Sequence, residues 1–292
     1  MEFSRFIAVD WSGAKNSGNI CVAECSSGSI APYLVPCPEG TRWTRTRLMS
    51  WLQTNFEASK TKLIAGFDFA FAFPYCEKKA YFPGHPDSPS ALRDLWATVD
   101  LVCKGSPDFY GGPFYSNEEA PFADYLCYQT YTGSFFSSGH RLTERACAEQ
   151  ATPPTSVYKC VGPDQVGPGS IAGMRFLHAL TLTNKKNLLS IWPFEDVMSI
   201  GVTIVEVFPR LFFLLAGCNP KQSSNSEIVN IALKYYGSEP LDATVGNLTE
   251  DKSDALVSAA ALRNLSINEA IWKPKSMTEC AKTYEGWIFG VR

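Results

Sequence analysis

The feature that most constrains the fold is a short apolar run near the amino terminus that ends in an acid. Phe6-Ile7-Ala8-Val9 is followed by Asp10 and then by a turn signal at Ser12-Gly13. A run that is apolar at every position predicts a strand buried on both faces, in the middle of a sheet. A carboxylate at the end of such a strand costs stability unless it is paired, hydrogen-bonded or bound to a cation. Asp10 is therefore the first candidate for a catalytic or metal-binding residue. The alternative is that it caps the turn.

A second strand that ends in an acid is expected at residues 62–67, followed by Asp68. Apolar residues at helical spacing in residues 41–59 predict a helix before it. A strand reached through a helical crossover lies parallel to its neighbour. If this strand pairs beside the first, Asp10 and Asp68 project from strands roughly 4.8 Å apart. Two carboxylates that close repel each other unless a cation lies between them. The alternative is that Asp68 only begins a loop.

The remaining pattern predicts an α/β protein with a mixed sheet flanked by helices. Short turns after the first strand indicate an antiparallel meander, and Ser88-Pro89 is typical of a helix start. The further strands are expected at residues 19–24, 30–35, 188–192 and 203–207, and the further helices at 88–103, 170–183, 209–216, 224–236 and 250–265.

A loop-rich insertion is expected at about residues 105–169, within a single domain of residues 1–292. Its many aromatic side chains either stack on bases or pack the insertion itself. Arg141 lies in a dense polar cluster and is a candidate for binding a substrate phosphate or carboxylate, with Glu144 beside it. The alternative is a surface salt bridge between these two residues.

The last clear helix carries acids on its first turns. Asp251 and Asp254 are three residues apart and so share a helix face. Acids also favour helix amino termini because of the helix dipole alone. Glu206 lies near the end of the predicted strand at 203–207, and Lys15 lies in the loop after Asp10.

Composition limits the classes of protein. The chain has 29 acidic and 26 basic residues, a formal net charge of −3, which does not favour a strong non-specific nucleic-acid binder. The first apolar run is too short for a signal peptide, and the most apolar later stretch, 211–216, is too short to span a bilayer. None of the ten cysteines forms a Cys-x-x-Cys pair, so most are expected to be small buried hydrophobes. We therefore expect a soluble, cytoplasmic protein without a membrane partner.

Four stretches together resemble a family of predicted ribonuclease H-like nucleases known as a domain of unknown function. The stretches are residues 7–14 (IAVDWSGA), 66–70 (GFDFA) with Pro74, 206–209 (EVFP), and 254–256 (DAL) with Ala259 and Ala260. They span the chain from the first strand to the last long helix. The order of strands and helices also resembles the ribonuclease H-like fold, and the helix at 250–265 is similar to one in Holliday-junction resolvases of that fold.

The resemblance implies a nuclease that hydrolyses phosphodiester bonds at a two-metal carboxylate site. Asp10, Asp68 and Asp254 would hold Mg²⁺ or Mn²⁺, with Glu206 or Asp251 as a further ligand. Two ions roughly 4 Å apart activate water and stabilise the leaving oxygen, and Lys15 or Arg141 would neutralise phosphate charge.

The expected partner of such an enzyme is a nucleic acid or a nucleotide, and the aromatic insertion also suits a small substrate in place of a duplex. Two other functions compete with it. One is a phosphotransferase or ATPase of the actin and sugar-kinase kind, and the other is a non-catalytic binding module on the same fold.

Overall fold

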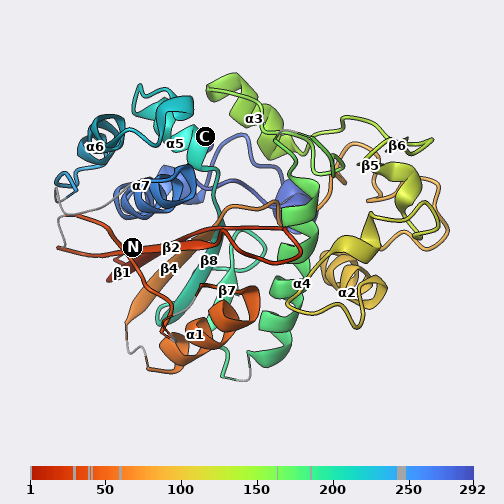
Figure 1. Ribbon diagram of the computed structural model, residues 1–292, viewed down its shortest axis with the longest axis horizontal. Coiled ribbons are helices and arrows are strands. Elements are labelled where there is room, and N and C mark those ends of the chain that lie inside the picture. The colour runs from red at the N-terminus through yellow and green to blue at the C-terminus, as the bar shows by residue number, and fades with distance from the viewer. Residues whose placement is uncertain are drawn as a thin grey trace.

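In a computed structural model, the described residues form a six-stranded mixed sheet with the strand order β3-β2-β1-β4-β8-β7 (Figure 1). The described residues are 2–28, 31–38, 40, 42–58, 61–162, 164–184, 186–241 and 248–292. The strands are β1 (Arg5–Asp10), β2 (Cys21–Ser26), β3 (Tyr33–Leu34), β4 (Lys62–Phe67), β7 (Leu189–Ile191) and β8 (Gly201–Glu206).

Strand direction follows the expectations from loop length. β1 pairs with β2 and β2 with β3 in antiparallel fashion, which confirms the predicted meander. β4 lies parallel to β1 on its other side, and β8 and β7 continue the parallel half. The crossover prediction is therefore confirmed. The third strand is shorter than the predicted 30–35, of which residue 30 lies outside the described residues.

The helices are α1 (Arg45–Ala58), α2 (Leu92–Val102), α3 (Leu142–Gln150), α4 (Gly167–Thr183), α5 (Pro209–Leu215), α6 (Ser226–Tyr235), α7 (Glu250–Leu265) and α8 (Glu269–Trp272). α7 begins and ends at the predicted residues. α1 begins later than the predicted 41–59, whose two end residues lie outside the described residues. The predicted start of α2 at Ser88 is wrong, because the Ser88 hydroxyl accepts a hydrogen bond from the Phe82 amide (3.1 Å) and the helix starts after Ala91.

Helices cover both faces of the sheet, which explains the fully apolar run in β1. Ile7 and Val9 pack with residues of α1 and α4 on one face, and Phe6 and Ala8 pack with residues of α5 and α7 on the other. Figure 1 shows α7 and α1 on opposite sides of the strands. Alternate side chains of a strand point to opposite faces, so a central strand covered twice has no polar face.

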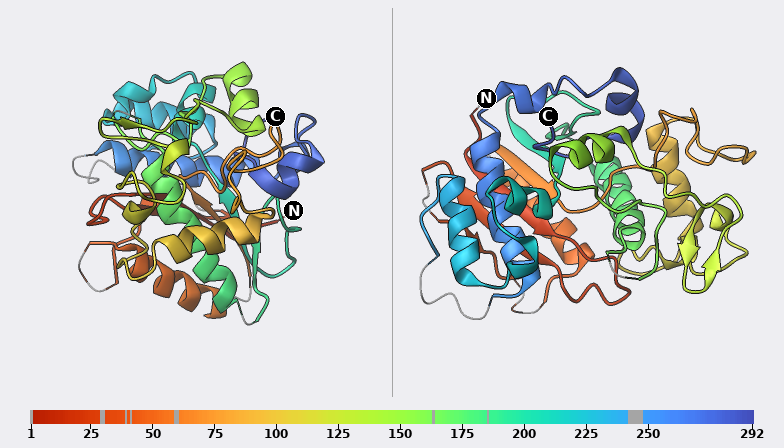
Figure 2. Two further views of the ribbon diagram at one scale, coloured as in Figure 1. Left: turned by 90° about the vertical axis from the view of Figure 1, so that its right-hand side faces the viewer. Right: turned by 90° about the horizontal axis from the view of Figure 1, so that it is seen from above.

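The insertion carries a small hairpin, β5 (Cys127–Tyr128) and β6 (Tyr131–Thr132), at the end of the molecule away from α6 (Figures 1 and 2). Many of its aromatic side chains are buried against one another. Phe122 stacks on Phe82, which precedes the insertion, with ring centroids 4.1 Å apart, and Phe114 contacts both. Packing is therefore the role of Phe114 and Phe122, whereas Tyr110, Tyr115 and Tyr128 line a cavity described below.

Cys76 and Cys280 form a disulfide across 204 residues of sequence. No spacing motif in the sequence indicates this pair. The other cysteines form no disulfide among the described residues, and those that are buried match the expectation of small hydrophobic side chains: Cys25, Cys37, Cys103, Cys147, Cys160 and Cys218. Within the described ranges, no helix has the length and apolar character needed to cross a membrane.

Candidate functional site

Asp10 and Asp68 leave the sheet side by side. Val9 of β1 is in register with Phe67 of β4, and the Asp68 amide donates a hydrogen bond to the Val9 carbonyl (3.1 Å). Asp10 is the last residue of β1, and Asp68 directly follows the last residue of β4. Both acids therefore lie at the carboxyl ends of adjacent parallel strands. Ligands of open α/β sheets bind at this edge. The pairing predicted from the crossover is the pairing that the structure shows.

Asp254 approaches the same edge from α7. This helix packs across β1 and β2, and its buried side includes Ala255 and Leu256. Asp254 lies on the first turns of α7 and lines the same cavity as Asp68. Its charge raises the pKa of Asp10, and the charge of Asp68 raises the pKa of Asp254. Asp251 and Glu250 add to this negative field.

Burial is the main cause of the pKa shifts at these acids. Desolvation raises the pKa of Asp10 and Asp254 well above the ordinary range, and the neighbouring carboxylates raise it further. Burial, followed by the charge of Glu206, raises the pKa of Asp68 to about 7. Within the described residues, no hydrogen bond and no basic side chain is among the causes that set the pKa of Asp10, Asp68 or Asp254; every cause raises it. The protein therefore does not stabilise the charged form of these carboxyls, and their neutral form is favoured in the absence of a cation.

The donor set suits a hard divalent cation, which prefers carboxylate oxygens. The coordination shell itself is not assembled, since among the described residues no three Asp, Glu, His or Cys side chains come close enough together to hold one ion. The residues therefore fit a cation by charge and ligand chemistry, and binding requires the carboxyl groups to move toward the ion.

Glu206 has a different environment from the three aspartates. It lies at the end of β8, in register with Phe67, and is 2% exposed. The Arg141 guanidinium donates to both of its carboxylate oxygens (2.8 and 2.5 Å), and the Phe71 amide donates a third hydrogen bond (3.1 Å). A carboxylate whose two oxygens are bound this way is neutralised by the protein itself.

Arg141 and Glu144 form a buried network. Each is 1% exposed. The salt bridge considered from the sequence is therefore present, but it is buried and not at the surface. Arg141 also donates to Glu144 (2.9 Å) and to the Glu285 carbonyl (3.0 Å), in addition to Glu206. Burial raises the pKa of Glu144, and Arg141 partly offsets this effect. Both side chains line the cavity described below, but their polar atoms are directed to one another.

Glu285 is a structural centre that the sequence alone did not identify. It is 1% exposed, and its carboxylate accepts hydrogen bonds from the amides of Tyr75, Cys76 and Leu142 (2.6, 2.7 and 2.8 Å). It thereby joins the segment after β4, the insertion and the end of the chain. The signal available in the sequence is a single acid before an apolar stretch, Trp287-Ile288-Phe289.

The loop after β1 is fixed by a buried arginine. Arg45 of α1 donates to the carbonyls of Ser12 (2.5 Å) and Ala14 (3.0 Å) and is fully buried. Gly13 approaches α4 so closely that a Cβ would lie 2.3 Å from the Gly169 nitrogen. Lys15 follows on this loop and is exposed.

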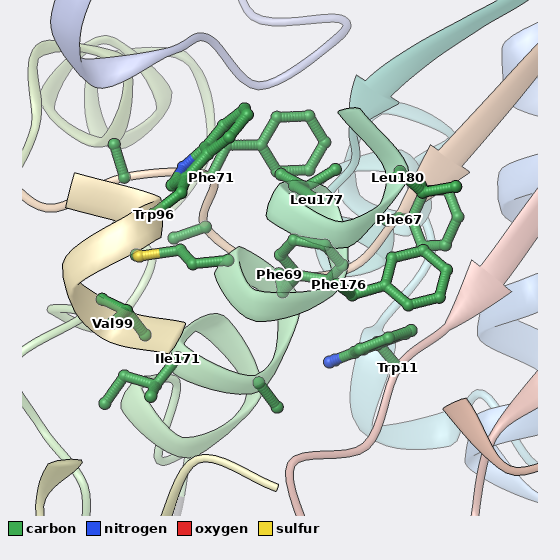
Figure 3. Close-up of a cluster of buried hydrophobic side chains, with 14 of the residues drawn as sticks. Trp11, Phe67, Phe69, Phe71, Trp96, Val99, Ile171, Phe176, Leu177 and Leu180 are labelled. Carbon is green, nitrogen blue, oxygen red and sulfur yellow. The ribbon is translucent and has the colours of Figure 1, made fainter. Parts of the chain in front are cut away.

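Trp11 anchors the start of the same loop. Its indole donates to the Gly169 carbonyl (3.0 Å) and its ring packs on Phe69 and Phe176 (Figure 3). This aromatic cluster packs the end of β1 against α4 and so fixes the start of the loop.

A cavity of about 750 Å³ is lined by residues from several of these elements. Its walls include the acids Asp68 and Asp254, the loop of Trp11–Lys15, the start of α4, and tyrosines of the insertion. Asp68, Asp254 and Lys15 line this cavity, and Arg141, Glu144 and Glu206 form a buried network along its wall. Asp10 ends the strand beside Asp68 but is not among the lining residues, and neither is Asp251. Comparison of the chain with protein-family models, with curated proteins and with solved structures found no match.

Proposed function

We propose that this protein is a divalent-cation-dependent nuclease with a ribonuclease H-like fold. The observation that carries the proposal is the group of three desolvated carboxyls, Asp10, Asp68 and Asp254, which come from three elements and whose pKa is raised by every cause among the described residues. Three antiparallel strands, a helix and a parallel strand beside the first also support the proposed fold.

Asp10, Asp68 and Asp254 would hold the cation. A bound Mg²⁺ or Mn²⁺ supplies an activated water and charge stabilisation for phosphodiester hydrolysis. Lys15, which is exposed beside the cavity, suits a role in binding substrate phosphate. Asp251 is the better candidate for a further ligand than Glu206, because Arg141 already occupies both Glu206 oxygens.

The test is a Mn²⁺ titration by calorimetry on the wild type and on Asp10→Asn, with a panel of DNA and RNA substrates assayed on the same samples. Asp87→Asn is the control, since Asp87 is an exposed acid that does not line the cavity. We expect the wild type and the control to bind Mn²⁺ and cleave substrate, and Asp10→Asn to do neither.

Other outcomes separate the alternatives. Absence of Mn²⁺ and Mg²⁺ binding by the folded wild type would overturn the proposal. Metal binding without cleavage of any nucleic acid or nucleotide would favour a binding module, and heat stabilisation that depends on ATP would favour a phosphotransferase or ATPase.

A further inference from the structure

The cavity has an aromatic wall that the acid cluster does not explain. Tyr110, Tyr115 and Tyr128, all from the insertion, line the same cavity as Asp68 and Asp254. Tyr115 is buried, whereas Tyr110 and Tyr128 are only half-buried. Two tyrosines on the cavity wall are therefore partly exposed, whereas Phe114 and Phe122 of the same insertion are buried.

Tyr110 is held in place from the backbone. Its carbonyl accepts a hydrogen bond from Arg175 (2.7 Å), whose Nε is bound to Asp100 (2.8 Å). The two preceding residues, Asp108 and Phe109, have φ of 51° and 55°, a conformation that costs free energy in residues other than glycine. The contacts of the turn keep this backbone in place, so the ring is presented from a fixed position.

Tyr128 is supported from its side. The ring of Tyr115 contacts it edge-on, with centroids 5.2 Å apart and planes at 62°. An edge-on neighbour fixes the plane of a ring while leaving a face free for another flat group. Burial, followed by the neighbouring Tyr110, raises the pKa of the Tyr115 hydroxyl.

The charges around the cavity complete the case for a nucleotide. Lys15, Arg210 and Lys221 line it with exposed basic side chains, which suit a phosphate. A volume of about 750 Å³ is in the usual range for small-ligand sites, about 300–1,000 Å³. A duplex is instead bound by many phosphate contacts across a basic surface, and this chain has a net charge of −3.

We infer that the cavity binds a nucleotide unit with an unpaired base, which stacks on Tyr128 and Tyr110 while its phosphate lies toward the acid cluster. The inference rests on the proposed function and narrows its substrate to free nucleotides or single-stranded ends. Stacking on aromatic side chains is how proteins bind single strands with little sequence preference.

The test is the binding of a fluorescein-labelled single-stranded dT 12-mer, measured by anisotropy in Ca²⁺ and again in EDTA. Tyr128→Leu should weaken binding about tenfold, since a stacked base contributes roughly that much or more, and Tyr128→Phe should retain it. Tyr131→Leu is the matched control, because Tyr131 is the cross-strand partner of Tyr128 but does not line the cavity. Thermal unfolding establishes that each variant is folded.

Competition assays identify the form of the ligand. If the ligand is a free nucleotide, thymidine monophosphate should displace the 12-mer. If the ligand is the end of a single strand, only longer strands should displace it. Ribose 5-phosphate, which has no base, should not compete, and the complementary strand should abolish binding. The inference is overturned if Tyr128→Leu binds like Tyr131→Leu, if ribose 5-phosphate competes equally with the nucleotide, or if the duplex binds equally with the single strand.

The two proposals fail separately. Loss of cation binding with intact, Tyr128-dependent nucleotide binding in EDTA would overturn only the nuclease. Cation binding and cleavage without dependence on Tyr128 would overturn only the stacking site.

Discussion

Arg141 and Glu206 form a bidentate ion pair in which both residues are almost completely buried, with N–O distances of 2.8 and 2.5 Å. The pair joins the start of α3 in the insertion to the end of β8 in the sheet. It lies beside the carboxyl of Asp68, whose pKa is raised by burial and by Glu206. The pair therefore holds the insertion against the sheet, and its Glu206 also raises the pKa of Asp68 in the acid cluster.

Arg141→Ala is expected to destabilise the fold by about 3–5 kcal/mol, because it leaves buried carboxylates without their partner. The measurement is the free energy of unfolding in urea. Arg145→Ala is a matched control on the same helix, since Arg145 pairs with Glu77 at the exposed surface, where an ion pair contributes about 0–1 kcal/mol. Equal effects of the two substitutions would show that the buried network is not a stability element.

Metal binding should distinguish the two aspartates of α7. Asp254→Asn is expected to weaken Mn²⁺ binding by at least about tenfold, because ligand charge determines affinity at such sites. Asp251→Asn should have a smaller effect, since Asp251 contributes less than Asp254 to the field at Asp10. Calorimetric titration of both variants measures this, and a larger loss in Asp251→Asn would reverse the assignment.

The pH dependence of stability should report Asp68 in protein freed of divalent cations. The folded pKa of about 7 lies above the ordinary value of 3.8, so the folded state binds more protons between these pH values. The contribution of Asp68 is therefore favourable below about pH 4 and is lost as pH rises toward 7. Asp68→Asn has no such titration, so its stability relative to wild type should increase over this range. Parallel urea-unfolding profiles from pH 4 to 8 would contradict the shift.

Gly13→Ala should destabilise the loop after β1. The added Cβ would meet backbone atoms of Pro168 and Gly169 at 2.3–2.6 Å, so α4 or the loop must move. Overpacking of this kind typically costs about 1–3 kcal/mol. Gly18→Ala is the control within the same loop, because its nearest neighbour is the flexible end of Arg42 at 3.4 Å. Thermal unfolding of the two variants should separate them clearly.

The sequence by itself determined the central elements of the fold. The apolar runs before Asp10 and Asp68 predict buried strands, and the crossover between them predicts their parallel pairing, because these features depend on local periodicity and chain connectivity. The same reasoning predicted α7 to the residue. These local rules were enough to place two acids at one edge of the sheet.

Only the tertiary structure decided which polar residues are neutralised. The sequence offers Glu206, Arg141 and Glu144 as further candidates beside the aspartates, yet they bind one another in a buried network that also involves Glu285. Such partners are separated by up to 144 residues, and no periodic pattern encodes contacts at that distance. The disulfide between Cys76 and Cys280 and the tyrosine wall of the cavity depend on the same long-range packing.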